Sequence, residues 1–510
     1  MKKSLLALFY LPMFLFAQSQ RQTVYLSVPE CYVQSFTPLP GGGNLLSGYS
    51  RYGTDSALVN LIFLNDSDEI TMHKEFNTST DFDFVSQVIP FSNGYLIGGK
   101  SSDPSFFHPQ VIRTDANGNV LWAKYFQNTS YWQGQVIRII PNGNAYSMYT
   151  FAETPFNDFY RMEGDAAGNA FTGWQYTPDT GMSFRIFDAE PMSNSSSHIL
   201  CGHANFNTSA SRGGLLMKTS PGGIQWSRHI TAGGNFKNDI VDVAAGADGN
   251  SYSLFVCENM PGNQYSTIVL KFDSLGNKIW AKQLSVSNGT LNGCSIIESS
   301  SHDFYVASYD NLLIAYLSKL DASGNLLWTH RWDPSASGGA TALKLFKDAG
   351  NNMVLAGKLI NRYFVSRLDA NGGGCSFSNS NAIAAATVNT VLTPVSFSAA
   401  AFSPAAVSEQ AVYSSVAFGE DMICGGLGIE EGIEKNGLLL YPDPVQDKLM
   451  IDNSQITKGN LVIYNAVGEK VYVGAYQAMS EVDCRNLTPG IYFIELTGGK
   501  KVLYAKFLKN

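Results

Sequence analysis

Residues 268–284 read IVLKFDSLGNKIWAKQL, and the same pattern recurs at 111–126 (VIRTDANGNVLWAKYF) and 316–332 (YLSKLDASGNLLWTHRW). Each copy places a Gly/Asn/Asp turn between two runs in which apolar and polar residues alternate, a pattern typical of a β-hairpin. Weaker copies lie at 62–74, 162–174, 215–228 and 365–374. The chain therefore contains seven copies of one hairpin unit, and this repeat decides the fold.

The repeat has a period of about 50 residues. The residue that begins the turn recurs at intervals of 48 to 54, at Asn65, Asp115, Asp165, Thr219, Asp273, Asp321 and Asp369. A second motif, a turn followed by a short apolar strand, precedes every copy, as at 92–99 (SNGYLIGG). A unit of this length accommodates about four strands, and a four-stranded sheet cannot bury both of its faces alone. The sequence therefore predicts an all-β fold in which residues 18–374 form a seven-bladed β-propeller.

The two ends of the repeat region are complementary. The seventh unit lacks its outer strand, because GGGCSFS follows where the tryptophan-bearing segment should be. An extra strand, TVYLSVPE at 23–30, stands ahead of the first unit. We therefore predict that residues 24–28 pair with residues 363–368 and close the ring.

The N-terminus has the pattern of a secretory signal peptide. Lys2 and Lys3 precede an apolar run of 13 residues at 5–17. A helix of that length measures roughly 20 Å, less than the roughly 30 Å of a bilayer's hydrocarbon core. Residues 1–17 are therefore predicted to be removed on export, and because no later stretch offers 18 uninterrupted apolar residues, no transmembrane segment is expected in the mature chain.

The composition excludes several classes of protein. The chain has 34 Lys and Arg against 42 Asp and Glu, a net charge of −8, so nothing favours nucleic acid as a partner. Charged residues make up only 15% of the chain, whereas it contains 48 glycines and 12% aromatic residues. This balance disfavours disorder and long helices, and it fits aromatic strands joined by tight turns.

A segment rich in Ser, Ala and Val follows the propeller at 375–428, and a short acidic linker follows at 429–435. Cys375 and Cys424 bracket this segment, and export permits disulfides, so we predict that they pair. Cys201 and Cys257 lie within predicted strands and are interpreted as small buried apolar residues. The sequence leaves the state of Cys31, Cys294 and Cys484 open.

Residues 436–510 consist of short amphipathic strands and turns, the pattern of a small β-sandwich. This stretch resembles the C-terminal sorting domain, type A, of the type IX (Por) secretion system. The resemblance depends on residues along the whole stretch: Tyr441, Pro442, Asp443, Pro444, Gly490, Tyr492, Lys506 and Lys509. Asp443 stands where the family usually has Asn. The resemblance implies export to the periplasm, transport across the outer membrane by the type IX secretion machinery, and either release or attachment at the cell surface.

Five tryptophans share one repeat position: Trp122, Trp174, Trp226, Trp280 and Trp328. A residue of this size at one position in blade after blade suits packing between blades, and we expect these side chains in the core. Trp132 and Trp332 lie off the pattern and are the candidates for a ligand surface.

The DANGN-type turns are similar in composition to calcium loops, but an Asp that caps its own turn explains them without a metal. The most oxygen-rich run contains Asp66, Asp68 and Glu69, which are the candidates if a cation binds. No zinc-protease motif, nucleophile elbow or phosphate-binding glycine loop occurs, so no cofactor and no catalytic residue is predicted.

The sequence favours a secreted or cell-surface binding or adhesion module for an extracellular glycan or protein over an enzyme. The alternative is a polysaccharide-degrading or other hydrolytic enzyme with its site at the propeller funnel. A self-associating surface-layer component is a third possibility. Carboxylates and histidines gathered at the funnel would favour the enzyme, whereas Ser, Thr and aromatic residues there would favour binding.

Overall fold

The computed structural model describes most of the chain between residues 21 and 509. The described ranges are 21–26, 31–39, 41–52, 56–77, 83–102, 107–127, 134–152, 158–168, 171–179, 182–193, 196–205, 212–232, 236–259, 264–286, 289–299, 301–334, 339–359, 362–369, 371–374, 377–402, 404–410, 412–414, 419–424, 438–441, 445–453, 456, 458–465, 468–477, 479–499 and 501–509. The predicted signal peptide, Trp132, Cys375 and the predicted linker lie outside these residues. Within the described ranges every regular element is a strand, and no helix is long and apolar enough to cross a bilayer.

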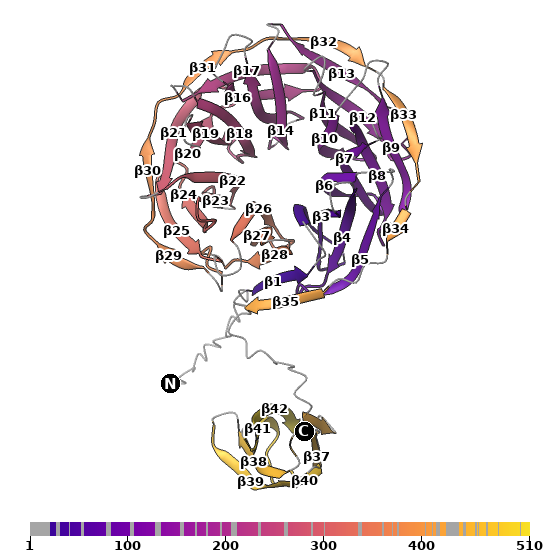
Figure 1. Cartoon of the computed structure of the whole chain (residues 1–510), viewed down its shortest axis with the longest axis vertical. Coiled ribbons are helices and arrows are strands. Elements are labelled where there is room, and N and C mark those ends of the chain that lie inside the picture. Colours follow the sequence, from indigo (N-terminus) through magenta and orange to yellow (C-terminus); the bar gives the residue numbers. More distant parts are fainter. Residues whose placement is uncertain are drawn as a thin grey trace, which may run out of the picture. The chain divides into compact units, whose positions relative to one another are not determined.

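The chain divides into two compact units, Met1–Gly428 and Ile429–Asn510. In the first unit, the described strands form seven five-stranded antiparallel sheets, which stand around a central axis as the blades of a propeller (Figure 1). The predicted fold class, an all-β propeller followed by a β-sandwich, is confirmed. The first strand of each repeat lies nearest the axis, and the next three follow outward.

Each of the first six repeats supplies four consecutive strands to its blade. Blade 1 contains β2 (Cys31–Pro38), β3 (Asn44–Tyr52), β4 (Ser56–Leu64) and β5 (Ile70–Asn77). Blade 2 contains β6 (Asp83–Phe91), β7 (Gly94–Ser102), β8 (Phe107–Asp115) and β9 (Val120–Gln127). Blade 3 contains β10 (Gly134–Asn142), β11 (Ala145–Ala152), β12 (Phe159–Asp165) and β13 (Phe171–Pro178). Blade 4 contains β14 (Ser183–Pro191), β15 (His198–Asn205), β16 (Arg212–Ser220) and β17 (Gly223–Thr231).

The remaining blades follow the same plan. Blade 5 contains β18 (Phe236–Ala245), β19 (Ser251–Asn259), β20 (Gln264–Phe272) and β21 (Lys278–Val286). Blade 6 contains β22 (Leu291–Glu298), β23 (Phe304–Asp310), β24 (Ala315–Leu320) and β25 (Leu326–Trp332). Blade 7 contains β26 (Ala340–Lys347), β27 (Met353–Leu359) and β28 (Arg362–Arg367), and it takes its fourth strand from the other end of the region, β1 (Arg21–Leu26).

The ring closes through antiparallel pairing of β1 with β28. The register runs from Arg21 opposite Arg367 to Tyr25 opposite Tyr363. The predicted closure is therefore confirmed, although the paired part of the first strand begins three residues earlier than the sequence suggested. The outer strand that the seventh repeat lacks is replaced by chain from the N-terminal end, so blade 7 joins residues more than 300 positions apart.

The turns of the repeat are held by their own aspartates. In blade 2, Asp115 Oδ1 accepts the backbone N–H groups of Asn117 (2.9 Å) and Asn119 (2.8 Å), and Gly118 adopts a left-handed φ of 75°. Asp273 and Asp321 hold their turns in the same way. These oxygens satisfy donors of the turn itself, which explains the DANGN-type pattern by turn chemistry.

The fifth strand of each blade comes from the Ser/Ala-rich segment. Residues 378–424, which we name the belt, run around the rim against the order of the blades and pair with the outer strand of one blade after another (Figure 1). Its strands are β29 (Ser378–Ser380) on blade 6, β30 (Ile383–Thr387) on blade 5, β31 (Val391–Pro394) on blade 4, β32 (Phe397–Phe402) on blade 3, β33 (Ala405–Glu409) on blade 2, β34 (Val412–Ser414) on blade 1 and β35 (Gly419–Cys424) on blade 7. The blades therefore have five strands, where the repeat length predicted four.

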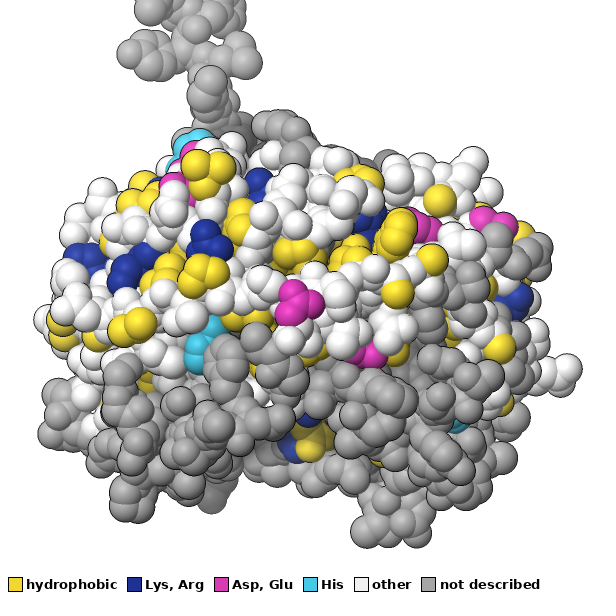
Figure 2. All heavy atoms as spheres, turned by 90° about the horizontal axis from the view of Figure 1, so that it is seen from above, with side chains coloured by type: hydrophobic (Ala, Val, Ile, Leu, Met, Phe, Trp, Pro, Cys, Tyr) yellow, Lys and Arg dark blue, Asp and Glu magenta, His cyan; other side chains and the backbone are white. Residues whose placement is uncertain are grey.

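A few contacts anchor the belt to the blades. Ile383 is buried in the core of blades 5 and 6, and Phe397 packs edge-on against Phe159 and Phe184 at 5.9 and 5.4 Å between ring centroids. Glu409 accepts hydrogen bonds from Ser101 (2.9 Å) and Gln110 (2.7 Å) of blade 2. The belt covers the outer edge strand of every blade, an edge that would otherwise offer unpaired backbone groups. Figure 2 faces the rim, where the described side chains carry few charges.

The second unit is a small β-sandwich. One sheet contains β36 (Leu438–Tyr441), β37 (Lys448–Asn453) and β40 (Met479–Asp483); the other contains β39 (Lys470–Gln477), β38 (Lys458–Asn465), β41 (Gly490–Gly498) and β42 (Lys501–Lys509). Leu449 and Ile451 of the first sheet share one core with Ile463, Ile494 and Phe507 of the second. This unit has its own core, as an independently folding domain requires.

Candidate functional site

A β-bulge interrupts the innermost strand of every blade at the same place. The extra residues are Gln34, Ser86, Ile137, Phe187, Val241 and Cys294 in blades 1 to 6; in blade 7, Ala342 and Leu343 face the single residue Gly357. A bulge bends its strand and re-aims the side chains beside it. The seven bulges therefore set the direction of the side chains along the wall of the central channel.

The residues that directly follow the bulges form a ring, which we name the post-bulge ring. Its members are Ser35, Gln87, Arg138, Asp188, Asp242, Ser295 and Lys344. Two of its uncharged members bind the backbone of the next blade: Gln87 accepts the N–H of Ile139 (2.7 Å), and Ser295 accepts the N–H of Leu345 (3.2 Å). This ring therefore stitches neighbouring blades together beside the axis.

The acidic members of the ring stand on two adjacent blades, next to Arg138 of blade 3. The Arg138 guanidinium lies 3.4 Å from Asp188 Oδ1 and also contacts Glu190. Asp242 Oδ2 accepts the N–H of Ile296 in blade 6 at 2.7 Å. Burial, reinforced by the charge of the nearby Asp188 carboxylate, raises the pKa of Asp242 to about 8. One of these two carboxyl groups therefore keeps a proton at neutral pH.

Lys344 differs from the rest of the ring. Its ammonium group makes no hydrogen bond or ion pair with any residue that the structure describes. Among the described residues of the seven bulges, only Ala342, two residues before Lys344 in blade 7, is a non-glycine residue in the left-handed region, with φ of 50°. Such a conformation costs about 1 to 2 kcal/mol for a residue with a Cβ. The wall that carries the unpaired cation is therefore also a strained one.

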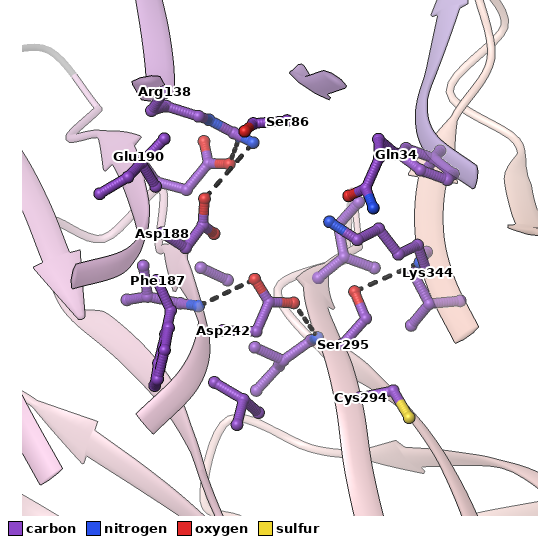
Figure 3. Close-up of a pocket in the computed structure, with 18 of the residues that line it drawn as sticks. Gln34, Ser86, Arg138, Phe187, Asp188, Glu190, Asp242, Cys294, Ser295 and Lys344 are labelled. Carbon is purple, nitrogen blue, oxygen red and sulfur yellow. Dashed lines mark hydrogen bonds and ion pairs between the residues drawn. The ribbon is translucent and has the colours of Figure 1, made fainter. Parts of the chain in front are cut away.

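A cavity of about 660 Å³ occupies the channel between these walls. Figure 3 shows Gln34 and Lys344 on one side and Arg138, Asp188 and Glu190 on the other, with open space between. Gln34 and Ser86 also have no polar partner among the described residues. Aromatic side chains from blades 1 and 2 complete this lining, with Tyr49 and Phe84 edge to face at 4.9 Å. The channel is the candidate site.

The structure corrects one predicted ligand residue and leaves another untested. Trp332 is only 6% exposed and packs against Phe364 (5.0 Å between centroids) and Phe377 (5.8 Å), so it belongs to the core between blades 6 and 7. It is not part of a ligand surface, because its position at the end of β25 turns it inward. Trp132 lies outside the described residues.

The repeated tryptophans serve the interfaces between blades, with one exception. Trp226 donates from Nε1 to the carbonyl of Ser274 (3.0 Å), and a Cβ built on Gly276 would lie 2.6 Å from its ring. Trp122, Trp280 and Trp328 lie against the turn of the next blade in the same way. Trp174 is 45% exposed, against expectation, because the next turn, TSPGG, has a different shape.

The three candidate metal carboxylates point to different partners. Asp68 is buried and accepts two hydrogen bonds from Arg367, Asp66 accepts the N–H of Gly43 (2.7 Å), and Glu69 accepts from Asn65 (2.7 Å). Within the described part of the chain, no group of three or more His, Cys, Asp or Glu is placed to hold a metal ion. The run is a turn joined to blade 7.

The remaining predicted residues concern the cysteines and the sorting domain. Cys201 and Cys257 are buried and unpaired, as small apolar residues, and Cys294 and Cys484 are unpaired as well. The pairing of Cys375 with Cys424 stays a prediction, since Cys375 is outside the described residues. In the sandwich, Tyr441 is opposite Met450 of β37, Tyr492 is buried, Lys506 is exposed and Lys509 is buried, whereas residues 442–444 are outside the described ranges.

Sequence reasoning missed the channel residues. A signal for them exists: the post-bulge residues recur at the period of the repeat and are polar or charged within strands that are otherwise apolar, as in VIRII at 136–140 and IVDVA at 240–244. These post-bulge positions can be recognised once the innermost strand of each repeat is known. Their side chains come together at one channel only because the ring of blades is closed.

Residues 439–510 match the family model of the secretion system C-terminal sorting domain. The recognition of a type IX sorting domain is thereby confirmed, and the protein is exported by type IX secretion to the cell surface or the extracellular space. Among solved structures, a europium-containing methanol dehydrogenase is similar, with 10% identity, a TM-score of 0.36, and coverage of 70% of this chain and 81% of that one. No curated protein matches the sequence.

Proposed function

We propose that this protein is a secreted or cell-surface saccharide-binding module whose ligand enters the central channel. One observation carries the proposal: Gln34, Ser86 and Lys344 line a cavity of about 660 Å³ and have no polar partner among the described residues. All three side chains are half-exposed on the channel wall, so their polar groups are accessible to a ligand that enters the cavity.

The size and lining of the cavity suit a small saccharide. Its volume lies within the range of about 300 to 1,000 Å³ that is common for small-molecule sites. Tyr49, Phe84 and Phe346 present apolar ring surface, and the polar side chains of the other blades offer both donors and acceptors. A sugar ring combines apolar C–H faces with hydroxyl groups, which matches this mixture.

The engagement of the carboxylates favours binding over hydrolysis. A glycosidase needs one carboxylic acid and one carboxylate that flank the scissile bond and are available to it. Here Asp188 and Glu190 contact Arg138, and Asp242 accepts the N–H of Ile296. These groups hold neighbouring blades together.

Hydrolysis of a polysaccharide is the second candidate, and a specific observation supports it. Asp242 has its pKa raised to about 8 and stands near Asp188, and two carboxyl groups with different protonation states are the pair that acid and base catalysis uses. On this reading Asp242 donates the proton and Asp188 acts as the base or the nucleophile.

A glycan array probed with the mature full-length chain tests the proposal. Binding should be lost when Ser86→Trp fills the channel and should be kept in Ser408→Trp, which places the same side chain on the exposed belt strand β33. Equal binding by both variants would place the ligand elsewhere. A matrix-protein arm of the same array tests the alternative of a protein ligand.

The enzyme candidate is tested on the same material. Release of reducing ends from bound polysaccharides, abolished by Asp242→Asn, would establish hydrolysis. Binding without release, with affinity kept in Asp242→Asn, is the result that we expect.

A further inference from the structure

The cavity has an uneven charge distribution. Five cations line it, at Lys100, Arg138, Arg185, Lys344 and Lys347, against four acids, Asp188, Glu190, Asp242 and Glu298. Because Asp188 and Asp242 together keep one proton at neutral pH, the lining has a net charge of about +2. The channel is therefore positive, although the whole chain has a net charge of −8.

Most of the cations already have a partner. Arg138 is held by Asp188 and Glu190, and Lys100 lies over the rings of Phe84 (4.7 Å) and Phe107 (4.1 Å). Arg185 lies over the ring of Phe151 at 4.9 Å. These groups are neutralised or stacked within the protein.

Lys344 and Lys347 remain without a partner among the described residues, and both belong to β26. A partly buried ammonium group loses hydration, and this loss is recovered only when an acceptor or an anion binds it. The strained Ala342, two residues before Lys344, persists because the surrounding structure imposes it, which is common at ligand sites.

The geometry points to Lys344 as the anchor for a carboxylate group of the ligand. We infer that the channel binds an acidic saccharide: its carboxylate contacts the Lys344 ammonium and the Gln34 amide, and its hydroxyls contact the opposite wall of Arg138 and Glu190. This inference rests on the proposed function and adds the chemical class of the ligand.

A carboxylate fits this site better than a phosphate or sulfate ester. Phosphate sites usually gather bidentate arginines or backbone N–H groups around several oxygens. Here the arginine of the post-bulge ring, Arg138, is occupied by carboxylates, which would also repel a dianion. The Lys344 ammonium beside the Gln34 amide suits a monoanion with two oxygens.

Isothermal titration of the mature full-length protein tests the inference. The probes are glucuronate, galacturonate and sialic acid oligosaccharides, each paired with its methyl ester, which keeps the sugar and removes the charge. We expect the acidic form to bind at least about tenfold more tightly, since a charge-assisted hydrogen bond contributes about 1.5 to 3 kcal/mol. The preference should weaken with salt less than an exposed ion pair does.

Three variants identify the residue. Lys344→Gln should abolish the preference for the acid, Lys344→Arg should keep most of it, and Lys458→Gln, the same charge change at an exposed position of the sandwich, should have no effect. Thermal unfolding of each variant checks that the propeller is folded.

The outcomes separate this inference from the proposed function. If acids and esters bind equally and Lys344→Gln changes neither, the inference is wrong while saccharide binding stands. If no saccharide binds the folded protein, both are wrong. Glucose 6-phosphate is titrated in the same way as the phosphate probe. If it binds more tightly than all the carboxylates, the ligand class is wrong.

Discussion

The Arg367 guanidinium of blade 7 binds the Asp68 carboxylate of blade 1 through two hydrogen bonds, from Nε to Oδ2 at 2.7 Å and from Nη2 to Oδ1 at 2.6 Å. Both side chains are buried, and Arg367 also contacts Asp348 at 2.9 Å. This two-point pair joins the last blade to the first, beside the strand pairing that closes the ring.

Removing one partner should weaken the closure. Asp68→Ala leaves the buried Arg367 with only one carboxylate, and breaking a buried pair in this way costs about 3 to 5 kcal/mol. Urea unfolding of the full chain measures the free energy of unfolding of the propeller. Asp66→Ala, two residues earlier on the exposed part of the same turn, is the control and should cost about 1 kcal/mol. Equal losses in the two variants would show that the pair does not hold the ring.

The packing of tryptophan on the next blade gives a second prediction. Gly276→Ala adds a Cβ 2.6 Å from the Trp226 ring, at a φ of 78°. Gly249 has nearly the same φ, 79°, but nothing lies within 4 Å of its added Cβ. Both substitutions carry the left-handed penalty of about 1 to 2 kcal/mol, and only Gly276→Ala adds an overpacking cost of about 1 to 3 kcal/mol. Denaturant unfolding should separate them, and identical midpoints would contradict the packing role of Trp226.

Asp242 makes stability depend on pH. Its pKa is raised from 3.8 to about 8, so the folded state holds a proton that the unfolded state releases between these values. The free energy of unfolding should therefore fall as pH rises from about 4 to about 8, by up to about 1.4 kcal/mol per pH unit from this group. Asp242→Asn should flatten the curve, whereas Asp333→Asn, in an exposed pair with Arg331, should leave its slope unchanged. Parallel curves for wild type and Asp242→Asn would refute the assignment.

The course of the belt adds a structural reason for the predicted disulfide. Gly374, the residue before Cys375, lies against Ser366 of β28; Ser366 is opposite Gln22 of β1, and Gln22 is opposite Cys424 of β35. The residue that precedes Cys375 and the last strand of the belt, which ends at Cys424, therefore both lie on blade 7. We expect one disulfide between Cys375 and Cys424 by peptide mass mapping, and Cys375→Ser should lower stability by about 4 kcal/mol in the chain-entropy model. Free thiols at both positions in the secreted protein would end this prediction.

The sorting domain should be necessary for surface delivery. Deleting residues 436–510 should leave a folded propeller in the periplasm, because the second unit has a core of its own. Cell fractionation and surface labelling measure the outcome. A chain truncated after Lys435 that still reaches the surface would contradict the role of this domain; a chain lacking only the belt is the control that separates export from folding.

The repeat was predictable because its sequence signals are local. A turn that begins at Asp115 or Asp321 caps itself, so its signal lies within five residues, and the period follows from counting such turns. The pairing of β1 with β28 was also predictable, since the seventh repeat lacks its outer strand and an extra strand precedes the first repeat. The sorting domain was recognised because its motifs extend over the whole module.

The belt and the channel were not predictable, for different physical reasons. Belt strands of only three to six residues are too short to show hydrophobic periodicity, and each is defined by the edge that it pairs with. The neighbours of Lys344 and Asp242 come from blades about 50 to 300 residues away, and only the closed ring brings them to one cavity. Trp332 was assigned to a surface because it lies off the repeat pattern, so no equivalent position in another blade indicated that it is buried.

The position of the belt in the chain, between the blades and the sorting domain, has a consequence for biogenesis. During synthesis the ribosome releases the seven blades first, then the belt, and last the sorting domain that directs export. A polypeptide that is truncated from its C-terminus loses the sorting domain before it loses any of the belt. Every molecule that presents a complete sorting domain to the secretion machinery therefore also contains the whole belt that surrounds its propeller.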